Sequence, residues 1–349
     1  MYSGNTPSRK NKEFFNGTIN WISSGELKEH YIYSTKERIS QGATNNLKLL
    51  SVGTFVIAIY GLEAEGVRGT GSITQEPSTI SQACMAFTPK GEITNEFLYS
   101  WYKKHGDVIG VKYAQGTKQQ NLSYDILEKF KISYPNAKEQ DKLNLFFSIL
   151  DKRISTQNKI IEKLETLIKG IAQHWIKNIT SRSIYVKLGD ICQITTGKLD
   201  ANAQVDNGIY PFFTCAEQPF KIDSFAFDTE ALLISGNGAN LGYINYYNGK
   251  FNAYQRTYVL DVFSENIQYI KWVLKVLLPK RIAIEKSSSN TPYILLSTLS
   301  DLMLPIPSKE NQYHIAELMQ SLERKLSSQI TLNGSYNILK QYLLRQMFI

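Results

Sequence analysis

The sequence of 349 residues predicts a mixed α/β (α+β) protein in which two copies of one module are separated by an antiparallel two-helix coiled coil. Three observations predict this fold. One long stretch carries an apolar seam with a period of about 3.5 residues. A second seam in the same phase lies near the end of the chain. Short strand-like apolar runs precede each seam, and the chain length suits about two domains.

The first long helix is predicted over Asp141–Lys177. Alternating steps of four and three residues meet apolar side chains at nine of ten positions. These positions are Leu143, Phe147, Leu150, Ile154, Gln157, Ile161, Leu164, Ile168, Ile171 and Trp175. The period is typical of a coiled-coil seam, and the run is longer than an ordinary globular helix. Gln157 is the central polar residue of the seam, and such residues often fix the register of a pair.

The second long helix is predicted over Tyr313–Met347. The same pattern of steps, with Ile315 in the place of Leu143, gives Ile315, Met319, Leu322, Leu326, Gln329, Asn333, Tyr336, Lys340, Leu343 and Met347. The two helices are predicted to pair antiparallel with Gln157 near Gln329. The alternative interpretation is two unrelated amphipathic helices, but their shared register extends beyond the helices.

That extension is an internal repeat. Phe130–Pro135 aligns with Leu302–Pro307, and Gln140 aligns with Gln312. The distance between Gln140 and Gln312 is the period of the repeat, and it is far longer than the roughly 20–50 residues of a solenoid repeat. The repeat therefore indicates a domain duplication. Each copy is predicted to end in a strand closed by proline, followed by its long helix. The predicted parts are residues 1–135 and 184–307 for the modules, 136–183 for the central helix and linker, and 308–349 for the last helix.

The elements within each module follow from composition and periodicity. In the first module we expect strands or strand ends at Trp21–Leu27, Phe55–Tyr60 and Ala83–Phe87, a helix over Asn95–Lys104, and loops at Glu63–Ser72 and Ala114–Asn121. In the second we expect an opening strand region at Val186–Ile194, strands at Ala231–Ser235 and Tyr243–Tyr247, and a helix over Ile267–Leu277. The loop Gly236–Gly242 is similar to a dinucleotide-binding fingerprint, but its spacing is one residue too long and a strand follows it. It therefore predicts a hairpin.

The formal net charge of +8 and the pI of about 9.1 suit a polyanionic partner. Residues 184–307 hold 10 basic and 11 acidic side chains, so DNA contacts there require individually placed residues. Basic and amide side chains in loops suit phosphate contacts and base edges; solvated surface loops are the alternative interpretation. The candidate DNA-binding residues are Arg9, Lys10, Lys12, Arg68, Lys112, Lys118 and Gln119 in the first module, and Lys198, Arg256, Lys286 and Asn290 in the second.

Several kinds of chemistry leave no sign in the sequence. The chain has no phosphate-binding G-x-x-x-x-G-K-[ST] motif, and none of the N-P-P-[FY] type expected of a DNA amino-methyltransferase. The cysteines Cys84, Cys192 and Cys215 and the four histidines lack metal-ligand spacing. No apolar run is as long as the roughly 18 residues of a membrane-spanning helix, so we expect a soluble, cytoplasmic protein. These observations favour a recognition scaffold without a catalytic site, metal or cofactor.

Particular segments resemble a known family. Gly4–Ser8, Phe14–Gly17 and Ile19–Leu27 are similar to the start of a target recognition domain in specificity (S) subunits of type I restriction-modification systems. The strand ending at Pro135 or Pro307, followed by Lys/Glu-Gln and a long helix, resembles the family's other hallmark. The resemblance implies a non-catalytic subunit whose two domains each read half of a bipartite double-stranded DNA target. It also implies that the helices dock methyltransferase subunits, expected as a pair, which bind S-adenosylmethionine and bring ATP-driven restriction subunits.

The first module departs from this pattern, because only Met1–Ser3 precede Gly4, whereas Ile184–Gly197 open the second module. We therefore expect the opening strand of the first module to be missing. Two other functions stay open at this point. One is a silent cassette or non-restriction adaptor on the same scaffold, and the other is an enzyme with an unrecognised active site.

Overall fold

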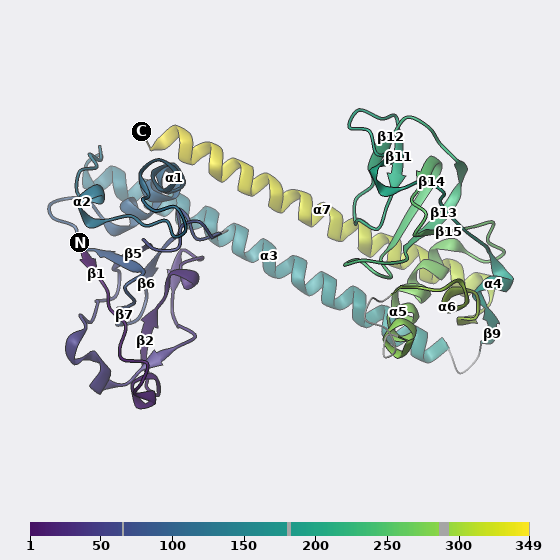
Figure 1. The fold of residues 1–349 in the computed structure, drawn as a ribbon, viewed down its shortest axis with the longest axis horizontal. Coiled ribbons are helices and arrows are strands. Elements are labelled where there is room, and N and C mark those ends of the chain that lie inside the picture. The colour runs from purple at the N-terminus through teal and green to yellow at the C-terminus, as the bar shows by residue number, and fades with distance from the viewer. Residues whose placement is uncertain (65, 180–182, 286–292, 349) are drawn as a thin grey trace. The chain divides into compact units, whose positions relative to one another are not determined.

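The computed structural model describes residues 1–64, 66–179, 183–285 and 293–348. The chain divides into two compact units (Figure 1): unit 1 comprises Met1–Lys159 and Thr331–Ile349, and unit 2 comprises Ile160–Ile330. Each unit contains one α+β module together with part of both long helices, α3 (Ala137–Ile179) and α7 (Lys309–Met347).

Unit 1 is built on two small sheets covered by one helix. The first sheet has the order β1 (Tyr2–Ser3), β8 (Cys84–Phe87), β5 (Phe55–Ala58), β6 (Gly71–Thr74) and β3 (Tyr31–Ile32). The second has the order β4 (Arg38–Ile39), β2 (Ile19–Ile22) and β7 (Ser78–Ile80). All four residues of β5 are buried, as expected for a central strand covered on both faces. The helix α1 (Asn95–Tyr113) is capped by the Thr94 hydroxyl, which accepts a hydrogen bond from the Phe97 amide, and the short α2 (Tyr124–Leu127) follows.

Unit 2 contains one larger sheet and a separate two-stranded antiparallel sheet. The sheet order is β10 (Gln193–Thr196), β15 (Thr257–Asp261), β13 (Phe227–Ser235), β14 (Ile244–Ala253), β11 (Tyr210–Phe213) and β12 (Phe220–Ile222). The helices are α4 (Leu188–Ile191), α5 (Ile267–Glu285) and α6 (Leu296–Ser300), and β9 (Ile184–Lys187) pairs with β16 (Met303–Ile306). The loop Gly236–Gly242 joins the antiparallel strands β13 and β14, so the predicted hairpin is confirmed.

The repeat is visible in strand register. Ser3 pairs with Met85 in unit 1, as Thr196 pairs with Tyr258 in unit 2, so Gly4 and Gly197 occupy equivalent places. A Cβ atom at Gly4 would lie 2.1 Å from the Ile80 carbonyl oxygen, and one at Gly197 would lie 1.9 Å from that of Ala253. Glycine is therefore required at both positions by the close approach of a neighbouring strand.

Two predicted strands are corrected by the structure. Phe130–Pro135 forms no strand, although its counterpart β16 pairs with β9 over four residue pairs. The physical reason is that a strand needs a partner, and the described residues of unit 1 provide none equivalent to β9. The predicted opening strand Val186–Ile194 is interrupted, because the short helix α4 separates β9 from β10.

The long helices run antiparallel. In unit 1, Arg153 on α3 donates a hydrogen bond of 3.1 Å to the Tyr336 hydroxyl on α7, and Asn333 donates one of 2.8 Å to Asn158. Phe147 and Phe348 are in contact nearby, with ring centroids 5.5 Å apart and planes tilted by 51°. The residue numbers of the contacting side chains on α7 decrease as those on α3 increase, so the two helices are antiparallel. This confirms the predicted orientation and fold class.

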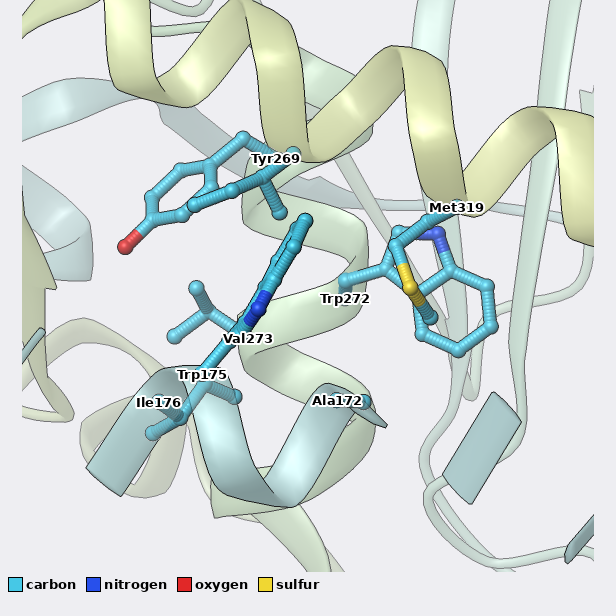
Figure 2. Close-up of a pocket in the computed structure, with 8 residues that line it drawn as sticks. Ala172, Trp175, Ile176, Tyr269, Trp272, Val273 and Met319 are labelled. Atoms are coloured by element: carbon cyan, nitrogen blue, oxygen red, sulfur yellow. The ribbon is translucent and has the colours of Figure 1, made fainter. Parts of the chain in front are cut away.

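In unit 2 the same two helices meet α5. Figure 2 shows Ala172, Trp175 and Ile176 of α3 facing Trp272 and Met319 of α5 and α7 across a small apolar pocket. Ile168, Ala172, Trp272 and Met319 form one buried cluster there.

Except for Met347, the predicted seam positions are shielded from solvent in both helices. Those that are buried or half-buried include Leu143, Phe147, Leu150, Ile154, Gln157 and Ile161 on α3, and Leu322, Leu326, Gln329 and Tyr336 on α7. Met347 is exposed, and Phe348 is buried beside it.

A buried glutamine joins each long helix to its module. In unit 2, Gln312 Oε1 accepts a hydrogen bond of 3.0 Å from the Asn266 amide at the start of α5, and Gln312 Nε2 donates one of 3.0 Å to the Pro307 carbonyl. In unit 1, Gln140 Oε1 accepts from the Thr94 amide at 2.9 Å, and its Nε2 donates to the Pro135 carbonyl at 2.9 Å. Both side chains are almost fully buried. The Gln140–Gln312 equivalence found in the sequence therefore reports a structural junction.

A buried charge cluster strengthens the junction in unit 1. The His30 ring is stacked between Tyr31 and Tyr99, with Nε2 2.9 Å from the Glu96 carboxylate and Nδ1 3.3 Å from that of Asp151 on α3. Burial alone would lower the pKa of His30, but the two carboxylates outweigh it and the pKa is raised. Burial likewise opposes ionisation of Asp151, yet His30 and Lys340 lower its pKa.

Unit 2 places a different cluster at the equivalent position. Glu323 on α7 aligns with Asp151, and its carboxylate lies 2.7 Å from Lys271 Nζ and 2.9 Å from Lys275 Nζ, both on α5. Burial would raise the pKa of Glu323, but the two ammonium groups lower it. In each unit, the carboxylate that contacts the module lies on a long helix, one residue after a seam position. Asp151 follows Leu150, and Glu323 follows Leu322.

We predict that Gln312→Met lowers the free energy of unfolding of unit 2 by about 2–4 kcal/mol, because buried backbone groups lose their partners. The control is Gln173→Met on an exposed position of α3 within unit 2, which should change it by no more than about 0.5 kcal/mol. Urea denaturation measures both. Equal effects of the two substitutions would show that the buried glutamine does not hold the junction.

We also predict that His30 makes the stability of unit 1 depend on pH. Its folded-state pKa lies above the unfolded value of about 6.5, so its stabilisation is fully present below pH 6.5 and is lost as pH rises through the folded pKa. The loss has a slope of at most about 1.4 kcal/mol per pH unit. Thermal melts above pH 6.5 should fall less steeply for His30→Gln than for the unsubstituted protein or for the exposed control His314→Gln. Parallel pH profiles for all three proteins would contradict this assignment.

Candidate nucleic-acid interface

Two loops of unit 1 meet at one end of its first sheet. We call residues 61–64 and 66–69 together with 115–121 the unit 1 loop pair. The Leu62 amide donates to the Gln120 carbonyl at 3.1 Å, and the Gln120 amide donates to the Glu63 carboxylate at 2.8 Å. The second hydrogen bond lowers the pKa of Glu63. The structure thus brings together two segments that are far apart in the sequence.

Within this loop pair, the Arg68 side chain lies against α1. Its guanidinium donates a hydrogen bond of 3.0 Å to the Gln120 side chain. A Cβ atom at Gly110 would lie 2.5 Å from Arg68 Cγ, so the side chain crosses α1 where the helix has no side chain of its own. Glycine inside a helix costs about 1 kcal/mol relative to alanine. Glycine at position 110 leaves the space that the Arg68 side chain occupies, which a Cβ atom would block.

The other predicted residues of this region are exposed. Lys118 and Gln119 lie in the 115–121 loop, and Lys112 lies in the last turn of α1 with its Nζ 5.5 Å from the centre of the Tyr113 ring. These side chains and Arg68 form a basic, amide-rich surface on a scaffold anchored by hydrogen bonds.

Arg9 has a partner within unit 1. Its guanidinium forms two hydrogen bonds with the Glu37 carboxylate, one of them 2.8 Å long, and lies 4.3 Å from the centre of the Phe15 ring. Hydrogen bonding to Arg9 lowers the pKa of Glu37. Arg9 therefore pairs within unit 1, whereas its neighbours Lys10 and Lys12 are exposed.

Four loops of unit 2 converge in a similar way. We call residues 197–200, 214–217, 236–242 and 254–256 the unit 2 loop cluster. The Gln255 amide donates to the Leu199 carbonyl at 2.9 Å, and the Gly236 amide donates to the Arg256 carbonyl at 2.8 Å. Asn240 Nδ2 donates to the Cys215 carbonyl at 3.0 Å. The cluster is therefore tied together by backbone carbonyls.

Two of the residues predicted for the second module lie in this cluster. Lys198 and Arg256 are both exposed, and the Gln255–Leu199 hydrogen bond brings their segments together. Lys286 and Asn290 lie outside the described residues. The chain returns to the cluster at Ile294, whose amide donates to the Gly236 carbonyl at 2.9 Å.

Sequence reasoning missed several amides that organise these surfaces. Gln120 holds Arg68, Gln255 Nε2 donates to Asp200 at 2.6 Å, and Asn240 bridges two loops. The available signal was weak, because isolated amides in polar loops are common on ordinary surfaces. Their loop partners are distant in sequence, so only the folded chain identifies them.

The described parts of the chain contain no group of three or more His, Cys, Asp or Glu side chains arranged to hold a metal ion. Within the same residues, no helix combines the length and apolar character needed to cross a membrane.

Comparison with known proteins shows a matching family. The family model described as the type I restriction modification DNA specificity domain matches residues 2–166 and again residues 183–333. The two matches correspond to the two halves of the internal repeat.

Individual relatives agree with the family match. The type I restriction enzyme EcoDI specificity subunit of Escherichia coli is 43% identical over 143 residues, covering 41% of this chain and 32% of that protein. The chain thus spans about a third of the length of this relative. The MjaIX specificity subunit of Methanocaldococcus jannaschii is 24% identical over 369 residues, covering 93% of this chain and 84% of that protein. The crystal structure of a type I restriction-modification S subunit from M. genitalium has the same fold, with a TM-score of 0.68, 19% identity and coverage of 100% of this chain and 93% of that one.

Proposed function

Because the chain belongs to the family of type I restriction modification DNA specificity domains, we propose that it is the DNA specificity subunit of a type I restriction-modification complex. Each unit reads one half of a bipartite double-stranded DNA sequence. The observation that carries this proposal is the presence of two family domains, each with a basic, amide-rich loop surface fixed to a long helix.

The side chains proposed to contact DNA lie in these loop surfaces. In unit 1 they are Arg68, Lys112, Lys118 and Gln119, with Lys10 and Lys12 as further phosphate contacts. In unit 2 they are Lys198 and Arg256, and the proposal extends to Lys286 and Asn290. Lysine and arginine neutralise phosphates, whereas arginine and amide side chains also suit base edges in the major groove. Arg9 is the weakest candidate, since Glu37 already neutralises it.

The long helices are proposed to dock the methyltransferase subunits, two of them in the assembled complex. Apolar side chains point outward from the helix pair as well as into its seam. On α3, Leu145 is 63% and Ile149 60% exposed, and on α7, Ile338 is 70% and Tyr342 58% exposed. Each pair is four residues apart and so shares one helix face. Exposed apolar stripes of this kind are typical of protein–protein interfaces.

The proposed role is recognition without catalysis. Sequence-specific binding and subunit docking need no nucleophile, metal or cofactor in this chain. The partner methyltransferase subunits would bind S-adenosylmethionine, and restriction subunits would join through them.

We predict that the double variant Lys112→Ala/Lys118→Ala weakens DNA binding of the assembled methyltransferase complex at all sequences. Each lost phosphate contact should flatten the dependence of log affinity on log salt by about one unit. Lys198→Ala/Arg256→Ala should act similarly, and a base contact by Arg256 would also relax one position of the motif, at about 1–3 kcal/mol. Fluorescence anisotropy across salt concentrations measures both effects.

The control is Lys152→Ala/Lys169→Ala, which removes two exposed lysines from α3 and should leave the salt slope unchanged. Arg9→Ala should lower the free energy of unfolding of unit 1. It should have little effect on the dependence of log affinity on log salt. If the control and the two loop variants behave alike, the proposed DNA-binding surfaces are wrong.

A further prediction concerns the spacer between the half-sites. Seven residues inserted into both α3 and α7, after Lys159 and after Ile330, keep the seam in phase. They lengthen the pair by about 10.5 Å at 1.5 Å per residue, so the preferred spacer should grow by up to about three base pairs at 3.4 Å each. The half-sites should stay the same, since no loop residue changes. Methylation-motif sequencing before and after insertion measures both, and an unchanged spacer would show that the helices do not set it.

A further inference from the structure

Each unit has an isolated strand bridge within its proposed DNA-binding surface. In unit 1, Tyr60 lies two residues after β5 and pairs antiparallel with Asn121, the last residue of the unit 1 loop pair. In unit 2, Asn237 lies two residues after β13 and pairs antiparallel with Tyr293. Both bridges therefore join one tyrosine to one asparagine.

Backbone hydrogen bonds show that the two bridges are equivalent in the internal repeat. The Leu122 amide donates to the Ile59 carbonyl at 2.9 Å, and the Ile294 amide donates to the Gly236 carbonyl at 2.9 Å. Leu122 and Ile294 are both buried. The residue after Ile59 therefore corresponds to the residue after Gly236, and the residue before Leu122 corresponds to the residue before Ile294.

The tyrosine and the asparagine exchange places between the two units. Tyr60 corresponds to Asn237, and Asn121 corresponds to Tyr293. Because each pair is flanked by a backbone hydrogen bond and is itself non-hydrogen-bonded, its two side chains lie on one face with Cβ atoms about 4.5–5.5 Å apart. A backbone requirement would keep each residue type at its own position. The exchange therefore indicates that the surface needs both side chains in either order.

An arginine proposed to contact DNA lies beside each bridge. Arg68 donates a hydrogen bond to the side chain of Gln120, which is next to the bridge of unit 1. The Arg256 carbonyl accepts one from Gly236, which is next to the bridge of unit 2. A ligand held by either arginine therefore meets the neighbouring tyrosine and asparagine.

The four bridge side chains have no role in holding the scaffold. Tyr60 is 38% and Tyr293 54% exposed, and Asn121 and Asn237 are half-buried. Among the described residues, no hydrogen bond joins these side chains to the protein. The Asn121 Oδ1 atom is buried without a partner there, which is unfavourable. Rotation of this amide toward a ligand that supplies a donor would remove that cost.

A turn is the other common role of asparagine before glycine, as in Asn237 and Gly238. In that role the side chain hydrogen-bonds the backbone about two residues further on. The described part of unit 2 contains no such bond from Asn237. The hairpin is closed by the backbone, because the Gly242 amide donates to the Ser235 carbonyl at 2.8 Å. The Asn237 side chain is therefore not required by the turn.

We propose that the tyrosine–asparagine pair of each unit reads one A·T base pair of that unit's half-site, which rests on the function proposed above. The asparagine amide donates to adenine N7 and accepts from adenine N6 in the major groove. The tyrosine ring contacts the thymine methyl group, which the same base pair presents in that groove. Two side chains on one face thus recognise both members of the base pair.

The test uses the assembled methyltransferase complex and DNA that carries base analogues. Methylation-motif sequencing first gives the two half-sites. Each adenine is then replaced in turn by 7-deazaadenine, which lacks the N7 acceptor, and each thymine by uracil, which lacks the methyl group. Fluorescence anisotropy measures the affinity of the unsubstituted protein and of Asn237→Ala, Tyr293→Ala and Tyr293→Phe for each DNA.

One 7-deazaadenine should weaken binding of the unsubstituted protein by about five-fold or more, but should have no effect on Asn237→Ala. Uracil in the same base pair should weaken binding by up to about four-fold, but should have no effect on Tyr293→Ala. Tyr293→Phe keeps the ring and should remain sensitive to uracil. A merely structural role of these side chains would not remove sensitivity to a single base atom.

The variants Asn121→Ala and Tyr60→Ala should behave in the same way at one base pair of the other half-site. Asn45→Ala and Asn207→Ala are the matched controls, since both residues are exposed and lie outside the loop surfaces. The controls should remain sensitive to both analogues. Urea denaturation checks folding, and Asn237→Asp, which keeps the side-chain shape without the donor, replaces Asn237→Ala if that variant is unfolded.

Two results would overturn this proposal and leave the proposed function intact. The first is a bipartite motif in which every analogue weakens binding of the asparagine variants as much as that of the unsubstituted protein. The second is loss of sensitivity in the two asparagine variants at the same half-site. Absence of any bipartite motif with the unsubstituted protein would overturn the proposed function and this proposal together.

Discussion

The buried glutamine at the start of each long helix is the interaction on which the rest of the structure depends. Gln140 and Gln312 each satisfy the backbone at a helix start in the module and the carbonyl of the proline before the long helix. An amide can do this because it both donates and accepts, and burial makes either lost hydrogen bond expensive. Each module is therefore joined to its long helix by two hydrogen bonds from one side chain.

The two units then diverge around the same framework. At equivalent helix positions Asp151 meets His30 and Lys340, whereas Glu323 meets Lys271 and Lys275. A half-buried carboxylate is tolerated only with such partners, since desolvation otherwise favours its protonated form. Both copies therefore have a carboxylate paired with basic side chains at the junction, although the paired residues differ.

The loops proposed to read DNA are tied to the scaffold by hydrogen bonds. Arg68 rests on a helix that carries glycine at the crossing point, and the unit 2 loop cluster is closed by backbone hydrogen bonds. Loops tethered in this way can change their side chains without changing the sheets.

The sequence by itself determined the features that local periodicity encodes. The apolar seam fixed the phase of both long helices, and the internal repeat predicted the duplicated modules and the Gln140–Gln312 equivalence. Pairing between distant segments was decided only by the tertiary structure. Phe130–Pro135 has the composition of a strand yet forms none, because a strand exists only beside a partner. The pairing of Arg9 with Glu37, 28 residues away, is likewise not visible in the local sequence. Lys198 and Arg256 are also far apart in the sequence. A backbone hydrogen bond between the neighbouring residues Leu199 and Gln255 brings their segments together, and only the folded chain shows it.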